Sequence, residues 1–197
     1  IFALTSYRNR SLFACSQAGF INNLNDGVAW GILPLLLAAR GLSLPQIGLV
    51  AGLYPLIWGL GQLGTGILSD TIGRKPLIVS GLLVQAAPHV VLGFGAAQPL
   101  GSGILGATLL GLGTAMVYPT LLAAISDTAH PSWRASALSV YRFWRDLGFA
   151  AGALLTGLIA DSLGLTSGVH AAGLLTFLSG LAAWRLMRSP HPAAASA

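Results

Sequence analysis

The chain has 197 residues, of which 54% are hydrophobic and only 8% are charged. An ordinary soluble domain has roughly a quarter of its residues charged, so this composition excludes that class and indicates an integral membrane protein. The formal net charge is +5. Because the charges stand at the ends of apolar segments, the positive-inside rule explains them better than nucleic-acid binding does. The single cysteine, Cys15, excludes an internal disulfide, and the start at Ile1 rather than Met indicates a piece of a longer protein.

Six apolar segments are long enough to cross a bilayer, which takes about 20 residues per helix. Charged residues, prolines and glycines divide the chain into predicted spans over 12–39, 45–69, 76–97, 101–126, 135–160 and 167–187. We expect residues 1–11 to be a cytoplasmic lead-in, 12–188 the transmembrane bundle and 189–197 a cytoplasmic tail. The predicted fold is all-α, integral to the membrane, with six transmembrane helices.

The lysines and arginines indicate how this bundle lies in the membrane. If the amino end is cytoplasmic, the cytoplasmic flanks hold Arg8, Arg10, Arg74, Lys75, Arg134, Arg185 and Arg188. The other side then holds only Arg40. This bias predicts that both termini are cytoplasmic, with the inner membrane of a bacterium as the expected location.

Short stretches of the first half of the chain recur in the second half. PLLLAA at 34–39 returns as PTLLAA at 119–124, and GILSDTIG at 66–73 returns as GLIADSLG at 157–164. Three predicted helices separate the copies, so the second copy faces the opposite side of the membrane. The pattern predicts an inverted three-plus-three repeat, which is the plan of a transporter half.

The turn at 66–75, with the pattern G-x-L-S-D-x-x-G-R-K, resembles the signature loop of the major facilitator superfamily. That loop joins the second and third helices of each six-helix half. The resemblance implies a transporter of two halves, of which this chain supplies one, and YRNR at 7–10 resembles the loop between halves, so we expect the carboxy-terminal half. It also implies a loop that latches the halves in one access state, formed here by Gly66, Asp70, Gly73, Arg74 and Lys75.

The first predicted helix carries a polar run near its midpoint, with Asn22, Asn25 and Asp26, followed by Trp30 one turn later. An ionised carboxylate at that depth costs about 2.5 to 3.5 kcal/mol on insertion scales. Asn22, Asp26 and Trp30 share one helix face, so we expect that face to line a central cavity. Asp26 is then either a protonation site or a counter-charge for a cationic substrate. The structural alternative is a buried polar cluster that joins helices.

Other polar side chains interrupt the second and fifth predicted helices. Tyr54, Trp58 and Gln62 share one face of the second helix, and we assign Tyr54 and Gln62 to the cavity, Trp58 less readily. In the fifth helix, Arg142 and Asp146 lie one turn apart and are expected to form a structural ion pair. Arg145 is expected to face the cavity or the partner half.

The sequence contains no motif that predicts catalysis, a cofactor or a metal site. It has no glutamate, no motif that joins Ser, His and Asp, and no phosphate-binding lysine loop. The expected function is therefore transport of a small organic solute by alternating access, coupled to protons, with efflux favoured by the resemblance. The expected partners are the lipid bilayer, the solute, protons and a second six-helix half. Two alternatives stay open: a half-size transporter that works as a homodimer, and a non-transporting membrane scaffold.

Overall fold

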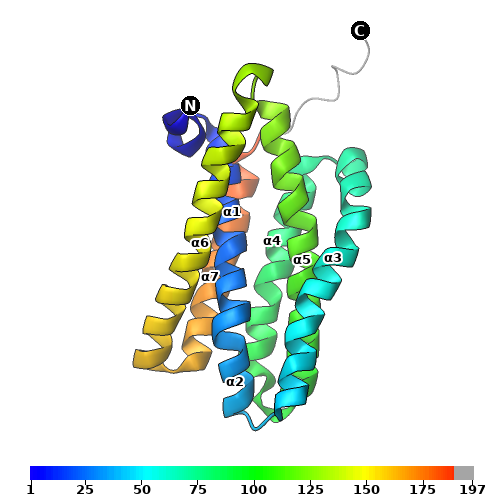
Figure 1. The fold of residues 1–197 in the computed structure, drawn as a ribbon, viewed down its shortest axis with the longest axis vertical. Coiled ribbons are helices and arrows are strands. Elements are labelled where there is room, and N and C mark those ends of the chain that lie inside the picture. The colour runs from blue at the N-terminus through cyan, green and yellow to red at the C-terminus, as the bar shows by residue number, and fades with distance from the viewer. Residues whose placement is uncertain (189–197) are drawn as a thin grey trace.

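The computed structural model describes residues 1–188, and all regular secondary structure in that range is helical (Figure 1). The longer helices are α1 (Arg10–Gly27), α2 (Leu33–Ala39), α3 (Leu44–Ile72), α4 (Arg74–Phe94), α5 (Pro99–Thr128), α6 (Arg134–Leu163) and α7 (Leu165–Leu186). Short π-helical segments η1 (Leu4–Arg8) and η2 (Val28–Ile32) precede α1 and α2, and the 3-10 turns η3 (Gly95–Ala97) and η4 (Pro131–Trp133) flank α5.

Five helices are long and apolar enough to cross a membrane: α3, α4 with η3, α5, α6 with η4, and α7. The all-helical membrane architecture predicted from composition is therefore confirmed. The first predicted helix, 12–39, is divided into α1, η2 and α2. Pro34 explains the division, because a proline lacks an N–H and its ring excludes the carbonyl four residues earlier, so the preceding turn widens to π-helical bonding.

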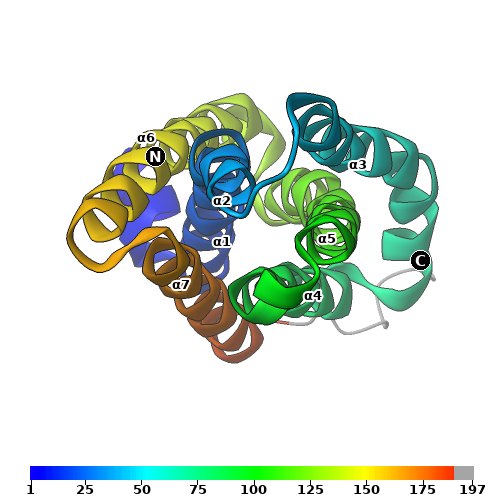
Figure 2. The ribbon, with the colours of Figure 1, turned by 90° about the horizontal axis from the view of Figure 1, so that it is seen from below.

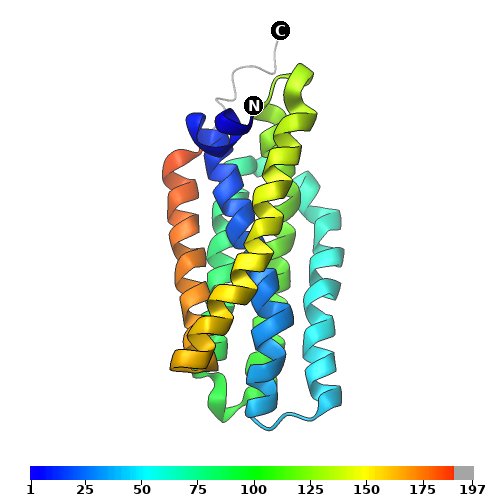
Figure 3. The same cartoon turned by 60° about the vertical axis from the view of Figure 1, so that its left-hand side comes forward.

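The helices run side by side along the long axis of the molecule (Figures 1 and 3). The N-terminus, the α3–α4 turn and the α5–α6 connection lie at one end, which we call the terminal end. The α2–α3 and α6–α7 connections lie at the opposite end. Viewed along the axis, α1 and α5 occupy the middle, α3 and α6 stand on the two flanks, and α4 lies beside α7 (Figure 2).

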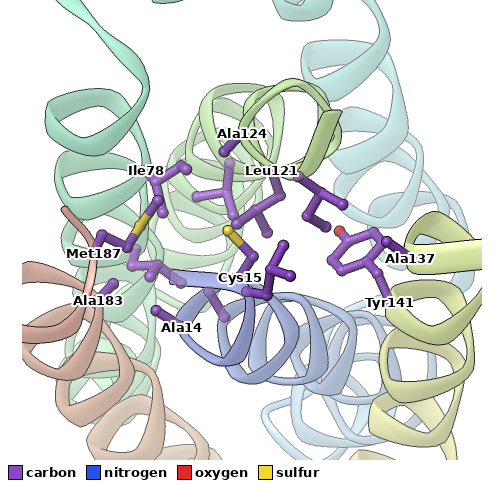
Figure 4. Close-up of a cluster of buried hydrophobic side chains, with 14 of the residues drawn as sticks. Ala14, Cys15, Ile78, Leu121, Ala124, Ala137, Tyr141, Ala183 and Met187 are labelled. Atoms are coloured by element: carbon purple, nitrogen blue, oxygen red, sulfur yellow. The ribbon is translucent and has the colours of Figure 1, made fainter. Parts of the chain in front are cut away.

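Burial follows this arrangement. In the most apolar stretch of each helix, 50% of the residues are buried in α4 and 56% in α5. The corresponding shares are only 11% in α3 and 17% in α6. Inside, one apolar cluster near the terminal end surrounds Cys15, which is 1% exposed and lies near Ile78, Leu121 and Met187 (Figure 4). The thiol thus acts as a packing group. A second cluster, which includes Leu24, Leu36 and Leu110, fills the other half of the bundle.

Glycines let α1 and α6 approach at backbone distance. A Cβ built on Gly27 of α1 would lie 2.8 Å from the carbonyl oxygen of Phe149. On α6, Cβ atoms at Gly148 and Gly152 would collide with the carbonyl groups of Phe20 and Leu24 of α1. The small-residue spacing in α6 therefore does bring two helices together. At other glycines, such a Cβ would meet no described atom within 4 Å outside the adjacent backbone, among them Gly31, Gly48, Gly52, Gly59 and Gly66.

Two glycines make the sharp turns that connect α3 to α4 and α6 to α7. Gly73 has φ +93° and ψ 157°, and Gly164 has φ +90° and ψ 157°. This region of backbone space is open almost only to glycine. The two turns therefore have the same conformation, although they lie at opposite ends of the bundle (Figure 1).

Candidate functional site

Asp26 lies in the last turn of α1 and is 8% exposed. Its carboxylate oxygen Oδ1 accepts a hydrogen bond from the hydroxyl of Tyr54, which α3 holds at 1% exposure. The Tyr54 oxygen also lies 3.3 Å from Oγ1 of Thr114 on α5. A row of hydrogen-bonding groups from α1, α3 and α5 thus starts at this carboxylate in the interior of the bundle.

A second set of hydrogen bonds extends this cluster toward α4. The side-chain amide Nε2 of Gln85 donates to Oδ1 of Asn22 and to Oγ1 of Thr114, both at 2.7 Å. Thr114 therefore joins the Gln85 amide to the Tyr54–Asp26 pair. Gln85 is fully buried and Asn22 is 1% exposed. Because water does not reach these side chains, their hydrogen bonds to each other take the place of hydrogen bonds to solvent.

Asn25 connects α1 to the last helix. Its Oδ1 accepts a 3.0 Å hydrogen bond from Oγ1 of Thr176 on α7. Several buried polar atoms keep unused hydrogen-bonding capacity, because no described residue bonds to Nδ2 of Asn22, Nδ2 of Asn25, Oε1 of Gln85 or Nε1 of Trp58. Buried polar groups are normally paired, so these four atoms are exceptions.

A row of aromatic rings leads away from Asp26. Trp30 of η2 meets Tyr54 edge-on with centroids 6.2 Å apart, and Tyr54 stacks on Trp58 at 6.2 Å. Trp58 meets Tyr118 of α5 at 6.1 Å, and the guanidinium carbon of Arg145 on α6 stands 4.7 Å above the Tyr118 ring. Such rings suit an organic or cationic solute. The row begins at a surface, because Trp30 is 51% exposed.

The structure corrects the expected ion pair on α6. Asp146 pairs with its neighbour Arg145, through Nη1 and Oδ1 at 3.2 Å, and the described residues form no salt bridge between Asp146 and Arg142. Arg142 and Asp146 are both exposed on α6, so no packing within this chain holds the two side chains together across the turn. Arg145 instead extends over Tyr118, and its buried Nε bonds to none of the described residues.

The turn after α3 holds a network of ionic contacts. Arg74 lies 2.5 Å from Asp70 through Nη1 and donates from Nε to Asp127 of α5 at 3.0 Å. Its Nη1 also bonds to the hydroxyl of Ser69. Arg74 therefore ties the carboxyl ends of α3 and α5 together, where carbonyl dipoles favour a cation. Lys75 forms no salt bridge among the described residues.

The sequence-predicted site residues thus fall into two places. Asp26, Asn22, Asn25, Tyr54 and Trp30 gather in or beside the buried cluster, whereas the turn residues lie at the terminal end. Gln62 is half-buried on α3 but makes none of the hydrogen bonds described in the cluster. Sequence reasoning missed the roles of Thr114, Thr176, Tyr118 and Asp127, and gave Gln85 no place in the site.

Comparison with known proteins identifies the family. The model of the Major Facilitator Superfamily matches residues 16–197. Inner membrane transport protein YajR of Escherichia coli is 35% identical over 138 residues, which are 68% of this chain and 30% of YajR. Inner membrane transport protein YnfM of the same organism is 30% identical over 156 residues, 79% of this chain and 37% of YnfM.

A third relative is the multidrug resistance protein MdtH of Aeromonas salmonicida, 35% identical over 117 residues, 59% of this chain and 29% of MdtH. The matched region is thus about a third of the length of these curated relatives. The family model and the relatives agree with the apolar helical bundle. The chain belongs to the Major Facilitator Superfamily, whose members are membrane transporters and not enzymes.

Proposed function

We propose that the described chain forms one half of a secondary transporter, built as an inverted repeat of three plus three membrane crossings. The α1–η2–α2 run, α3 and α4 form the first triplet, and α5, α6 and α7 form the second. The contacts between the two triplets are symmetric, since the first member of each packs on the second member of the other: α1 packs on α6 and α5 packs on α3. The matching conformations of Gly73 and Gly164 support the relation.

The orientation proposed for this half places the terminal end in the cytoplasm. Arg10, Arg74, Lys75 and Arg134 belong to helix ends or turns at that end, as the positive-inside rule requires. The names of YajR and YnfM, both inner membrane transport proteins, support the inner membrane of a bacterium as the location. The expected cytoplasmic lead-in at residues 1–11 agrees with this orientation, and we propose that the chain is the C-terminal half of the transporter. The expected cytoplasmic tail at 189–197 lies outside the described residues.

The function that this geometry supports best is proton-coupled transport of a small organic solute by alternating access. The observation that carries it is the contact of Asp26 with Tyr54 in the interior of a membrane bundle, beside aromatic rings and unpartnered polar atoms. A carboxylate within a membrane domain is costly and typically marks an ion or substrate pathway. Asp26 binds and releases the proton, while Trp30, Tyr54, Trp58 and Tyr118 contact the solute.

The test uses the full-length protein in proteoliposomes with an imposed pH gradient. A panel of solutes is first screened by thermal shift, because a ligand that binds the folded state raises its apparent stability. We expect the stabilising solute to accumulate when the gradient is present and to stop accumulating when a protonophore collapses it. Transport that is unaffected by the protonophore would rule out proton coupling.

Efflux is the direction we propose, because MdtH is named as a multidrug resistance protein. Arg145 and the aromatic row offer contacts to planar organic molecules, which are common among drugs. Ethidium is a suitable first probe, since its fluorescence reports its concentration inside cells. Loss of the gene should raise retained ethidium; lower retention would indicate uptake instead.

The second half of the transporter is proposed to pack on the exposed flanks of α3 and α6. These helices bury the smallest share of their apolar stretches within this chain, and the open glycine row of α3, which includes Gly48, Gly52 and Gly59, faces outward. Small residues on an outward face permit close approach of another helix. That half belongs either to the same polypeptide or, in the homodimer alternative, to a second copy.

Expression of this chain by itself separates the alternatives. A homodimeric transporter requires solute-dependent proton flux from the chain alone, with two copies per particle. A non-transporting scaffold requires that neither this chain nor the longer protein moves any solute that it binds. Flux that needs both halves supports the proposal made here.

The ionic network at Arg74 is proposed to hold the halves in one access state. Replacing Arg74 by Gln removes its contacts to Asp70 and Asp127. Exposed ion pairs contribute about 0.2 to 1 kcal/mol each, so loss of both pairs should change the ratio of access states roughly twofold to thirtyfold. Distances between spin labels on the two halves measure those populations.

Lys75→Gln is the matched control, because it removes one charge from the same turn without removing a described salt bridge. Asp127→Asn should reproduce part of the Arg74 effect. Equal shifts from Arg74→Gln and Lys75→Gln would show that the ion pairs do not act as the latch.

A further inference from the structure

The contact between α4 and α7 lies on the opposite side of the bundle from the gap between α3 and α6 (Figure 2). Here each helix places a histidine against a glycine of the other. A Cβ built on Gly173 of α7 would lie 2.6 Å from the Cβ of His89 on α4, and one on Gly93 of α4 would collide with the ring of His170 on α7. Both imidazoles therefore lie in the α4–α7 contact, and Nδ1 of His89 also lies 3.0 Å from the backbone oxygen of Gln85 one turn earlier.

A groove of about 640 Å³ follows this contact along the outside of the bundle. Its walls are apolar and well exposed, and they include Val90 at 56%, Leu174 at 60% and Phe177 at 45%. Because both walls belong to membrane-crossing helices, the groove opens to lipid tails rather than to water. A second hollow, which shares Leu83 with the first, continues the seam toward Lys75.

Two nitrogen-bearing side chains meet the end of α4 beside Phe94 of the groove wall: Arg40, which does not itself line the groove, and His170, which does. Arg40, which follows α2, donates from Nη1 to the carbonyl of Leu92 at 2.6 Å and from Nη2 to that of Gly93 at 3.3 Å. It thereby caps the carboxyl end of α4. His170 covers the same Gly93, and its ring lies 5.6 Å from that of Phe94 in the groove wall.

The guanidinium of Arg40 has five N–H donors, and the two carbonyls occupy two of them. The described residues form no further hydrogen bond with the remaining donors, so these donors and the exposed His170 ring can bind an anion at the level of the membrane surface. This combination of a cation and an apolar groove suits an anionic lipid. The phosphate of such a lipid can bind the cation while one acyl chain lies in the groove.

We propose that the α4–α7 groove is a binding site for one anionic phospholipid of the leaflet opposite the termini. Its phosphate binds Arg40 and His170, and one acyl chain lies against Val90, Leu174 and Phe177. The site rests on the membrane placement proposed above but not on the transport cycle. A second copy of the chain suits the groove less well than a lipid does. The apolar helix face of a second copy could fill the groove, but it would bring no anion to Arg40.

Quenching by brominated lipids tests this site in the full-length protein. Phe177→Trp adds a reporter in the groove wall, and its signal is the difference from the parent protein in the same vesicles. Vesicles contain phosphatidylcholine with either brominated phosphatidylglycerol or brominated phosphatidylcholine. We expect phosphatidylglycerol to bind roughly fivefold more tightly, which corresponds to about 1 kcal/mol for one basic residue at a membrane surface.

Two variants separate the head contact from the chain contact. Arg40→Gln in the reporter protein should reduce the preference to about one, whereas Arg142→Gln, an exposed arginine on α6, should leave it unchanged. Ala87→Phe fills the groove from an exposed position on α4 and should weaken quenching by both lipids. Because this variant keeps the Arg40 cap, it tests the groove even if Arg40→Gln loosens the end of α4.

Equal quenching by the two lipids in the reporter protein would overturn the proposal, as would a preference that survives Arg40→Gln. Absence of quenching by either lipid would show that protein covers the groove. In that case Ala87→Cys should form a disulfide-linked dimer, and the seam would be a contact between copies.

Discussion

Asp26→Asn in the full-length transporter is expected to abolish proton-driven accumulation of solute. The rate should fall by roughly two orders of magnitude or more, the loss typical when a proton-transferring side chain is removed. Asparagine keeps the size of the side chain and an oxygen that can accept the Tyr54 hydrogen bond, but it cannot bind and release a proton. Initial rates in proteoliposomes, with and without a pH gradient, measure the effect.

Solute exchange without a gradient distinguishes the two roles predicted for Asp26. A protonation site is needed only for coupling, so Asp26→Asn should still exchange internal for external solute. A counter-charge for a cationic solute is needed for binding, so the same variant should lose exchange and affinity together. Transport by Asp26→Asn that keeps its full pH dependence would remove Asp26 from the proton pathway.

Asp161→Asn provides a matched control. It removes one carboxylate from α6, but this side chain is exposed and does not belong to the buried cluster. We expect coupled transport to remain near the parent rate. Thermal unfolding of both variants shows whether any loss of activity reflects the fold instead.

The hydrophobic sequence determines most of the helical architecture, because a segment that crosses lipid must satisfy its backbone internally and expose apolar side chains. Hydropathy therefore located α3 to α7 to within a few residues. Hydropathy did not predict η2. A π-helix differs from an α-helix in bonding each N–H to the carbonyl five residues back instead of four, and this difference leaves the hydropathy of the segment unchanged. Pro34 was the available signal, because proline disturbs the turn that precedes it.

The site was only partly predictable, for a different reason. Asp26 and Asn22 were conspicuous because polar groups are costly in lipid. Thr114 and Thr176 were not, since threonine is common in membrane helices and often bonds to its own backbone, as Thr176 also does with Ala172. Their roles depend on which helices meet, and one sequence does not encode that pairing in a local pattern.

The same limit explains the wrong ion pair on α6. Spacing by four residues places Arg142 and Asp146 on one face, but it does not reveal a competing contact on another helix. Tyr118 of α5 offers that contact by binding the guanidinium of Arg145. Arg145 then lies where its Nη1 can reach Asp146.

Gly152→Leu is expected to disrupt the contact between α1 and α6. A Cβ at this position would lie 2.9 Å from the Cα of Leu24 and closer still to its carbonyl oxygen. Overpacking of a tight contact costs about 1 to 3 kcal/mol, and here the neighbour is backbone, which cannot rotate away. We expect a clearly lower unfolding temperature and a smaller folded fraction after extraction in detergent, measured by size-exclusion chromatography and tryptophan fluorescence.

Gly157→Leu tests whether the effect is local to that contact. Gly157 lies on the same helix, but apart from the adjacent backbone of α6 no atom of residues 1–188 comes within 4 Å of a Cβ built there. Leucine is a better helix former than glycine by nearly 1 kcal/mol, so the half described here should tolerate this change or gain stability. If Gly157→Leu instead destabilises the full-length protein as strongly as Gly152→Leu, the face of α6 that carries Gly157 must pack against the second half. Such a result would map the proposed interface onto the flank that this chain leaves exposed.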